Sequence, residues 1–177
     1  KYKYVNILRV PIMEHHTIIY GRAMHQAVTK YFQLKMQGLK MGLDDLLNAF
    51  SESFDPQGFL DEKHQQERFR VGRDALIRFF DTEEKRDSKP LFIEKEFSFV
   101  LENNRLTGRF DRIDMEEDGA VIMDFKTSEI NKQKDADKRT KESLQLAIYA
   151  LAYQNIFGSF PKRTELYFLE SGLIGSA

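Results

Sequence analysis

The first half of the chain places apolar residues three or four positions apart, which is the spacing of one face of an α-helix. Residues 21–37 show this spacing most clearly, and residues 43–54 repeat it until Pro56 ends the run. Residues 61–82 begin polar and become apolar towards their end. The pattern predicts three helices, which make up a helical N-terminal part over residues 1–88.

After this helical part the period of the pattern changes to two, which indicates β-strands. Strands are predicted at 91–101, 105–115 and 120–127. Three acidic residues and Gly119 lie between the last two strands, and such a sequence favours a tight hairpin turn in which glycine takes a positive φ. We therefore expect a meander of three antiparallel strands.

Beyond the third strand the chain is charged or polar over 129–142, and this segment is predicted to be a flexible connection. Helical spacing returns at 143–157, and a final strand is predicted at 164–170. A strand, a helix and a further strand in this order favour a crossover. The expected fold is α/β, with a mixed central sheet built from an antiparallel meander plus a crossover helix and strand. We expect one domain over 1–177, with its α/β core at 89–177.

Composition narrows the class of protein. Of the 177 residues, 41% are hydrophobic and 31% are charged, which is typical of a globular domain and not of a disordered tail or a membrane protein. The chain contains no cysteine, which excludes a disulfide scaffold and thiol catalysis and is compatible with a reducing cytoplasm, the location we expect. The first residue is Lys1, so we expect the chain to be part of a longer polypeptide.

The third predicted strand carries an acid and an amine among apolar residues. Asp124 and Lys126 are two positions apart, so they project from the same face of the strand. An exposed Asp–Lys pair on a strand is commonly a solvated ion pair of little consequence. The surrounding run 121–125, however, has the composition of a strand buried on both faces, where charged side chains are rarely found without a function.

A second carboxylate, that of Asp111, lies on the preceding strand and is expected to converge with Asp124 across the hairpin. Two neighbouring carboxylates repel each other unless a cation lies between them. Oxygen ligands of this kind suit Mg²⁺ or Mn²⁺, which lowers the pKa of a bound water and neutralises charge on a phosphate. Lys126 would add a positive charge beside the same site.

These residues belong to four short motifs whose order resembles the RecB-like branch of the PD-(D/E)XK nuclease superfamily. The motifs are Tyr20-Gly21-Arg22-Ala23-Met24-His25, Gly108-Arg109-Phe110-Asp111-Arg112-Ile113-Asp114, Asp124-Phe125-Lys126-Thr127 and Gln145-Leu146-Ala147-Ile148-Tyr149. The resemblance covers nearly the whole chain, and similar domains stand at the C-terminal end of UvrD/Rep-like and AddB-like helicase-nucleases. It implies a restriction-endonuclease-like fold.

Carried over residue by residue, the resemblance implies that Asp111 and Asp124 bind the metal and that Lys126 is the catalytic lysine. The main-chain carbonyl of Phe125 and the side chain of His25 would be further metal ligands. A lone histidine on an amphipathic helix is more often a core or surface residue, and it is the motif that favours a ligand here.

Four residues around this centre are expected to bind the substrate. Gln145 and Tyr149 share one helix face at i and i+4, so they would line the site or contact DNA, unless they are simply hydrogen-bonding residues of that face. Arg109 and Arg112 flank the acidic motif and are expected to bind phosphate.

Three further acidic residues lie in or near these strands. Glu94 or Glu96 would supply an extra acidic group, and the sequence does not choose between them. Asp114 falls on the opposite face of its strand from Asp111, so it is expected to be turned away or solvated.

Histidines and basic residues outside the motifs are expected at the surface. This expectation applies to the adjacent His15 and His16, whose side chains point in different directions, and to His64. Residues 126–141 contain six Lys and Arg against three Asp and Glu, a net charge of +3. Such a segment is either a solvated charge run or a contact for the DNA backbone.

Together these observations predict a divalent-metal-dependent DNA nuclease domain, exonuclease-like, acting on strands delivered by a helicase in the same polypeptide or complex. That role would belong to DNA repair or recombination. The alternative is a catalytically silent module that binds DNA or braces a helicase. Many relatives hold an iron–sulfur cluster with four cysteines, but this segment has none, so we expect no cluster within it.

Overall fold

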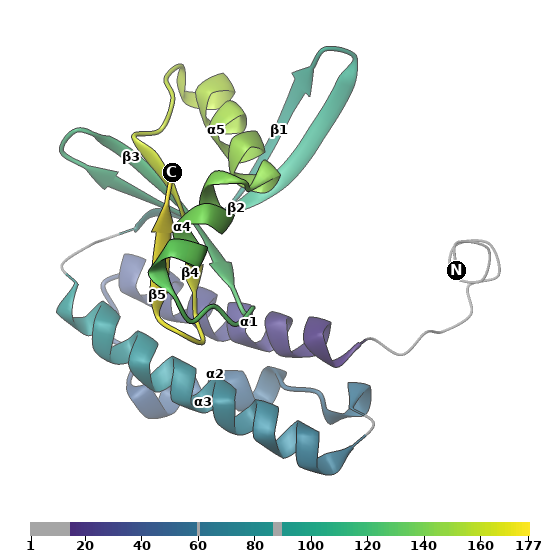
Figure 1. Cartoon of the computed structure of the whole chain (residues 1–177). Coiled ribbons are helices and arrows are strands. Elements are labelled where there is room, and N and C mark those ends of the chain that lie inside the picture. Colours follow the sequence, from purple (N-terminus) through teal and green to yellow (C-terminus); the bar gives the residue numbers. More distant parts are fainter. Residues whose placement is uncertain (1–14, 60, 87–89) are drawn as a thin grey trace.

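The computed structural model describes residues 15–59, 61–86 and 90–177. Three helices come first, then a three-stranded meander, then two helices and two strands (Figure 1). The elements are α1 (His16–Met36), α2 (Leu43–Ser53), a 3-10 turn (Pro56–Gly58), α3 (Glu62–Lys85), β1 (Pro90–Leu101), β2 (Asn104–Glu116), β3 (Gly119–Lys126), α4 (Gln133–Lys141), α5 (Leu144–Phe157), β4 (Arg163–Phe168) and β5 (Leu173–Ser176).

The strands form one mixed sheet in the order β1-β2-β3-β4-β5. The pair β3–β4 is parallel and is joined by the crossover through α4 and α5, whereas the other neighbours are antiparallel. Gly119 has a φ of +143° in the turn between β2 and β3, a conformation that L side chains rarely adopt. The predicted α/β fold with a mixed sheet and an N-terminal helical part is confirmed.

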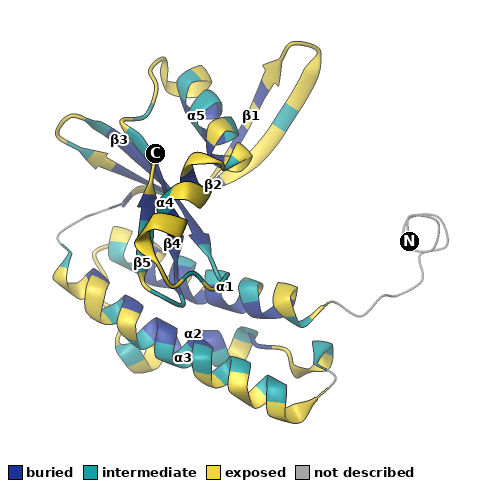
Figure 2. Cartoon of the chain, in the orientation of Figure 1, coloured by how far each residue is buried: buried dark blue, intermediate teal, exposed yellow. Residues whose placement is uncertain are grey.

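Helices cover both faces of the sheet. Helices α1–α3 form a layer on one side, and α4 and α5 lie on the other (Figure 1). Met123, Phe125 and Tyr167 belong to the core shared with α1–α3, whereas Ile122 and Phe168 belong to the core under α5. Strand β3 is therefore buried on both faces, as its composition predicted, and Figure 2 shows it in dark blue at the centre of the molecule.

Two elements were not predicted from the sequence. The flexible connection expected at 129–142 is largely helix α4, and a fifth strand, β5, follows β4. Helix α4 buries only Ala136 and Thr140, so its sequence shows no apolar stripe. Its partner is β5, where a Cβ added to Gly175 would lie 2.2 Å from the Thr140 hydroxyl oxygen. Glycine is thus required for this close approach of the two elements.

Candidate active site

Strand β3 carries an acid and an amine that contact each other beneath α5. The Nζ atom of Lys126 lies 2.6 Å from Oδ2 of Asp124. Asp124 is only 1% exposed, whereas a third of the Lys126 side chain reaches solvent. The two side chains thus project from one face, as their spacing predicts, with the carboxylate buried and the ammonium group accessible.

Helix α5 fixes this pair through the amide of Gln145. Its nitrogen donates to Oδ1 of Asp124 at 2.7 Å, and its oxygen accepts from Nζ of Lys126 at 2.8 Å. The hydroxyl oxygen of Tyr149 lies 2.8 Å from the same amide nitrogen and 3.4 Å from Oδ1 of Asp124. Burial, together with the charge of Asp124, raises the pKa of Tyr149, which therefore remains a neutral hydroxyl. The i and i+4 spacing places both side chains in the site, next to Asp124.

Asp111 enters the site where the pairing of β2 with β3 ends. The last residues paired between these strands are Arg112 and Met123, while the β1–β2 hairpin continues past β3 (Figure 1). Just past the end of that ladder, the main-chain N–H of Phe125 donates to Oδ2 of Asp111 at 2.9 Å. A side-chain carboxylate thus accepts from a backbone donor, and this bond fixes Asp111 against β3.

His25 on α1 completes the cluster. Its Nε2 lies 2.8 Å from the carbonyl oxygen of Phe125, and its Nδ1 lies 3.6 Å from Oδ2 of Asp111. Because a carbonyl oxygen only accepts hydrogen bonds, Nε2 carries the proton in this contact. The rings of Phe32 and Phe125 stack with centroids 5.9 Å apart, which packs α1 onto β3 at this point. Three of the groups expected to bind metal, His25, Asp111 and the Phe125 carbonyl, therefore lie together.

Burial and the repulsion between two carboxylates set the electrostatics of this cluster. Burial, and next the charge of Asp124, raise the pKa of Asp111 to about 6, although His25 and the Phe125 N–H act in the opposite direction. Lys126 is paired with Asp124, whereas Asp111 is contacted by His25 and by the main-chain N–H of Phe125. A cation bound beside Asp111 would favour its charged form and lower its pKa.

The donor atoms fit a hard divalent ion. Carboxylate and carbonyl oxygens with one imidazole nitrogen are acceptable ligands for Mg²⁺ or Mn²⁺. Oδ2 of Asp124 is buried and makes no hydrogen bond of good geometry, although it contacts Lys126 as an ion pair. Among the residues described, no three His, Asp and Glu side chains are already grouped to hold an ion. Asp124 is turned to α5, whereas Asp111 and His25 bind the main chain of Phe125.

Arg112 lies on the opposite face of β2 and is fully buried. Its guanidinium donates two hydrogen bonds of 2.7 Å to Asp114, reaches Glu83 at 3.2 Å and lies 4.2 Å from the centre of the Phe32 ring. The expectation that Arg112 binds phosphate is wrong, because its side chain is 0% exposed. Asp114 is turned away from Asp111, as predicted, but it is ion-paired in the interior.

Arg109 and Glu94 form an ion pair at the edge of the site. The Nε atom of Arg109 lies 2.5 Å from Oε2 of Glu94, and more than half of the Arg109 side chain is exposed. Glu94 has a φ of +54°, an unusual conformation for a non-glycine residue, and its Oε1 accepts from Thr29 at 3.1 Å. Its charge contributes to the raised pKa of Asp111, whereas Glu96 is exposed and lines a different hollow. Of the two candidates, Glu94 is the one near the site.

A groove of about 600 Å³ runs from His25 and Asp111 along α1. Its α1 wall contains Arg22, Gln26 and Lys30, all exposed and four residues apart. The sequence analysis missed these three residues. Their i, i+4, i+8 spacing, beside the apolar face of the same helix, could have indicated a polar stripe facing a groove.

The basic residues after β3 remain on the surface. Helix α4 and the turn before it expose five positive side chains: Lys132, Lys134, Lys138, Arg139 and Lys141. Because the segment is helical, its charges are held on a fixed scaffold, contrary to the flexible connection that was expected. Contact of this segment with DNA stays a prediction.

Comparison with known proteins identifies the class. A model of the PD-(D/E)XK nuclease superfamily matches residues 1–174, so the chain belongs to this superfamily. A search of curated proteins found no significant match. Membership supports the prediction of a nuclease and agrees with the mixed sheet described above. A search for membrane-spanning segments found none among the helices in the described parts of the chain.

Proposed function

We propose that the chain is a divalent-metal-dependent DNA nuclease domain of the RecB-like type, which hydrolyses phosphodiester bonds. The observation that carries the proposal is the meeting of Asp111, His25 and the Phe125 carbonyl at one side of β3, beside the Asp124–Lys126 pair. In this proposal the domain is exonuclease-like and acts on strands that a helicase in the same polypeptide or complex delivers.

In the proposed site His25, Asp111, Asp124 and the Phe125 carbonyl hold Mg²⁺ or Mn²⁺, which supplies an activated water and neutralises phosphate charge. Lys126 presents an accessible ammonium group that orients the water or stabilises the charge developing on the phosphate. Gln145 holds that ammonium group and the Asp124 carboxylate at fixed positions, so the order of the site does not depend on substrate.

The groove along α1 supports a nucleic-acid substrate. Arg22, Lys30 and Arg109 line it together with Glu94, so its four charged residues outside the catalytic cluster sum to +2. A positively charged groove that ends at the cluster is suited to the backbone of a single strand. Its exposed cations would bind phosphates without reading sequence.

One observation favours the alternative, a catalytically silent module that binds DNA or braces a helicase. The charge of Asp124 is already neutralised by Lys126, so this half of the site is complete without a metal ion. A module of that kind needs no cation. Titration calorimetry with Mn²⁺ separates the two proposals, because a nuclease gives saturable heat that Asp111→Ala abolishes and a silent module gives none.

The function is tested by incubating the chain with end-labelled single-stranded and double-stranded DNA in Mn²⁺, Mg²⁺ or EDTA. We expect degradation with either metal, a loss of about a thousandfold or more in Asp124→Ala and Lys126→Ala, and no activity in EDTA. The matched controls are Asp118→Ala and Lys40→Ala, an acid and an amine on exposed segments outside the cluster, the groove and the basic segment around α4. Equal digestion by wild type and Asp124→Ala would show that the assignment is wrong.

A further inference from the structure

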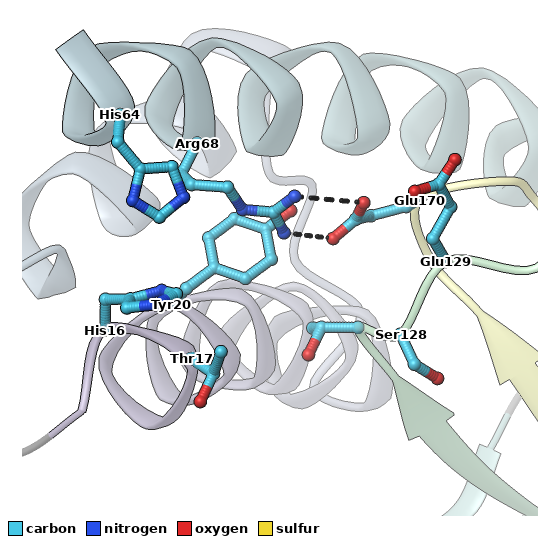
Figure 3. Close-up of a pocket in the computed structure, with 9 residues that line it drawn as sticks. His16, Thr17, Tyr20, His64, Arg68, Ser128, Glu129 and Glu170 are labelled. Atoms are coloured by element: carbon cyan, nitrogen blue, oxygen red, sulfur yellow. Dashed lines mark hydrogen bonds and ion pairs between the residues drawn. The ribbon is translucent and has the colours of Figure 1, made fainter.

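A second hollow lies on the other side of α1 from the groove. It is the α1–α3 pocket, a cavity of about 360 Å³ lined by the first turns of α1 and α3, residues 127–129 and Glu170 (Figure 3). The pocket and the groove share no lining residue. Between them α1 passes close to the end of β3, since a Cβ added to Gly21 would lie 3.3 Å from the Thr127 hydroxyl oxygen. The pocket thus begins directly after Lys126.

Flat rings form much of the pocket. His16 and His64, expected at the surface, are half-buried, and their rings meet edge to face with centroids 4.7 Å apart. The buried ring of Tyr20 supports this wall, and it is covered by the Arg68 guanidinium, 4.1 Å from its centre. Figure 3 shows these rings on one side of the cavity and Ser128 and Glu170 on the other. Such surfaces are suited to stacking a planar ligand.

Two hydroxyl groups at the pocket wall are buried. The hydroxyl oxygen of Ser128 makes no hydrogen bond of good geometry, and that of Tyr20 interacts with the carboxylate of Glu170 but likewise without good hydrogen-bond geometry. Tyr20 is 2% exposed, and burial, together with the nearby carboxylate of Glu170, raises its pKa. Buried polar groups without partners are costly, so their presence at a cavity wall favours a ligand with polar edges.

The charges of the pocket disfavour a phosphate ligand. Arg68 is its only lysine or arginine among the lining residues, and it is already ion-paired with Glu170. Glu129 adds an uncompensated carboxylate, so these three residues sum to −1. Burial, and next the neighbouring His15, lower the pKa of His16, which is therefore neutral at pH 7. A neutral planar molecule with polar edges fits these constraints better than an anion does.

We propose that the α1–α3 pocket binds one nucleobase of the DNA strand, close to the bond that is cut. This inference rests on the proposed nuclease function, which supplies the strand. The base stacks on the half-buried rings of His16 and His64, its polar edge faces the hydroxyls of Tyr20 and Ser128, and its sugar-phosphate backbone continues past Thr127 towards Lys126. From Tyr20 to His25 the rise of α1 is about 8 Å, so the base belongs to a nucleotide next to the cut or one beyond it.

The chain contains four histidines, whose ring-proton signals in NMR report on the two sites separately. The probes are a thymidine pentamer and a pentamer of the same backbone with abasic residues, both added in EDTA so that no cleavage occurs. We expect the thymidine pentamer to shift the His16 and His64 signals saturably, and the abasic pentamer to leave them in place. If both pentamers shift these signals alike, or neither does, the base pocket is wrong.

Variants sharpen the same titration. Ser128→Ala and Tyr20→Phe each remove one hydroxyl and keep the packing, and each should weaken binding of the thymidine pentamer about three- to tenfold. Binding of the abasic pentamer should not change in either variant. Ser159→Ala, an exposed serine outside the pocket, is the control and should leave both affinities unchanged. A loss for both pentamers, or for neither, would contradict the proposal.

The result is independent of the nuclease test. The titration uses no metal and no cleavage, whereas the nuclease assay uses both. Shifts of His16 and His64 with an inactive domain would keep the base pocket and overturn catalysis. Metal-dependent cleavage without those shifts would keep catalysis and overturn the pocket.

Discussion

Neighbouring residues on β2, Asp111 and Arg112, lie on opposite faces of the sheet in two charged clusters of different character. Arg112 is fully buried and donates to Asp114 and Glu83, and Glu83 is also paired with Arg86, so two acids face two bases. Asp111 faces a second carboxylate, and burial and repulsion raise its pKa. A buried charged cluster with matched partners indicates a structural role, whereas one with excess charge of one sign indicates a functional site.

Sequence position does not distinguish these two clusters. Both arise from the run Asp111-Arg112-Ile113-Asp114, and the alternation of a strand assigns the residues to opposite faces. The contrast can be measured, because loss of a matched charge should destabilise the fold and loss of an excess charge should stabilise it.

The largest loss of stability is expected for Arg112→Met, which leaves the Asp114 carboxylate buried without its cation and leaves Glu83 paired with Arg86 alone. We expect a loss of about 3–5 kcal/mol in the free energy of unfolding, measured by urea denaturation. The control Arg109→Met, on the same strand but exposed, should cost less than about 1 kcal/mol. If the two variants lose similar amounts of unfolding free energy, Arg112 does not have the structural role proposed for it.

Asp111→Asn, by contrast, is expected to increase the free energy of unfolding when no metal is present. The folded-state pKa of Asp111, about 6, lies above its ordinary value of 3.8, so ionisation at pH 7.5 opposes folding. The amide removes this charge and can still accept from Phe125, so the variant should be about 1–3 kcal/mol more stable than wild type at pH 7.5.

The pH dependence checks the cause of this gain. The stability that a neutral Asp111 gives wild type is present below pH 3.8 and is lost as the pH rises through about 6, so the difference between the proteins should largely vanish by pH 4. Thermal unfolding in EDTA at several pH values measures it. Mn²⁺ should stabilise wild type but not Asp111→Asn; a variant less stable at pH 7.5 would refute the repulsion.

The smallest effect is expected for Gln145→Leu, which removes the amide between Asp124 and Lys126. We expect the apparent affinity for Mn²⁺ or the rate of cleavage to fall about 10- to 100-fold, with stability reduced by only about 1 kcal/mol. Gln154→Leu, on the same helix but lining a different hollow, is the control. Equal activity of the two variants would show that Gln145 has no positioning role.

Local sequence patterns predicted most of the fold because each of those elements buries a regular stripe of its own. The alternation around Asp124 and Lys126 predicted both their shared face and the burial of β3. Helix α4 has no such stripe, and its stability depends on the close approach of Gly175 in β5. That contact is made between residues far apart in the chain, so a local pattern does not contain it.

The sequence also predicted only part of the candidate site, because the rest depends on contacts between residues far apart in the chain. The resemblance to the four motifs implied that His25 lies with Asp111 and Gln145 with Asp124, but it did not separate Arg109 from Arg112, because both flank the same acid. Their different environments depend on α1 and α3, which close over Arg112. The choice of Glu94 over Glu96 likewise depends on the left-handed backbone at residue 94. The sequence gives no sign of that conformation, because the residue there is not a glycine.

Helix α1 contributes to both hollows, with Tyr20 in the α1–α3 pocket and His25 in the groove. Its 21 residues form one uninterrupted rod, so the separation between these two points is fixed by helical geometry. If both proposals hold, a DNA strand held in the pocket would be cut at a fixed distance from the bound nucleotide, and the length of α1 between the two points would set that distance.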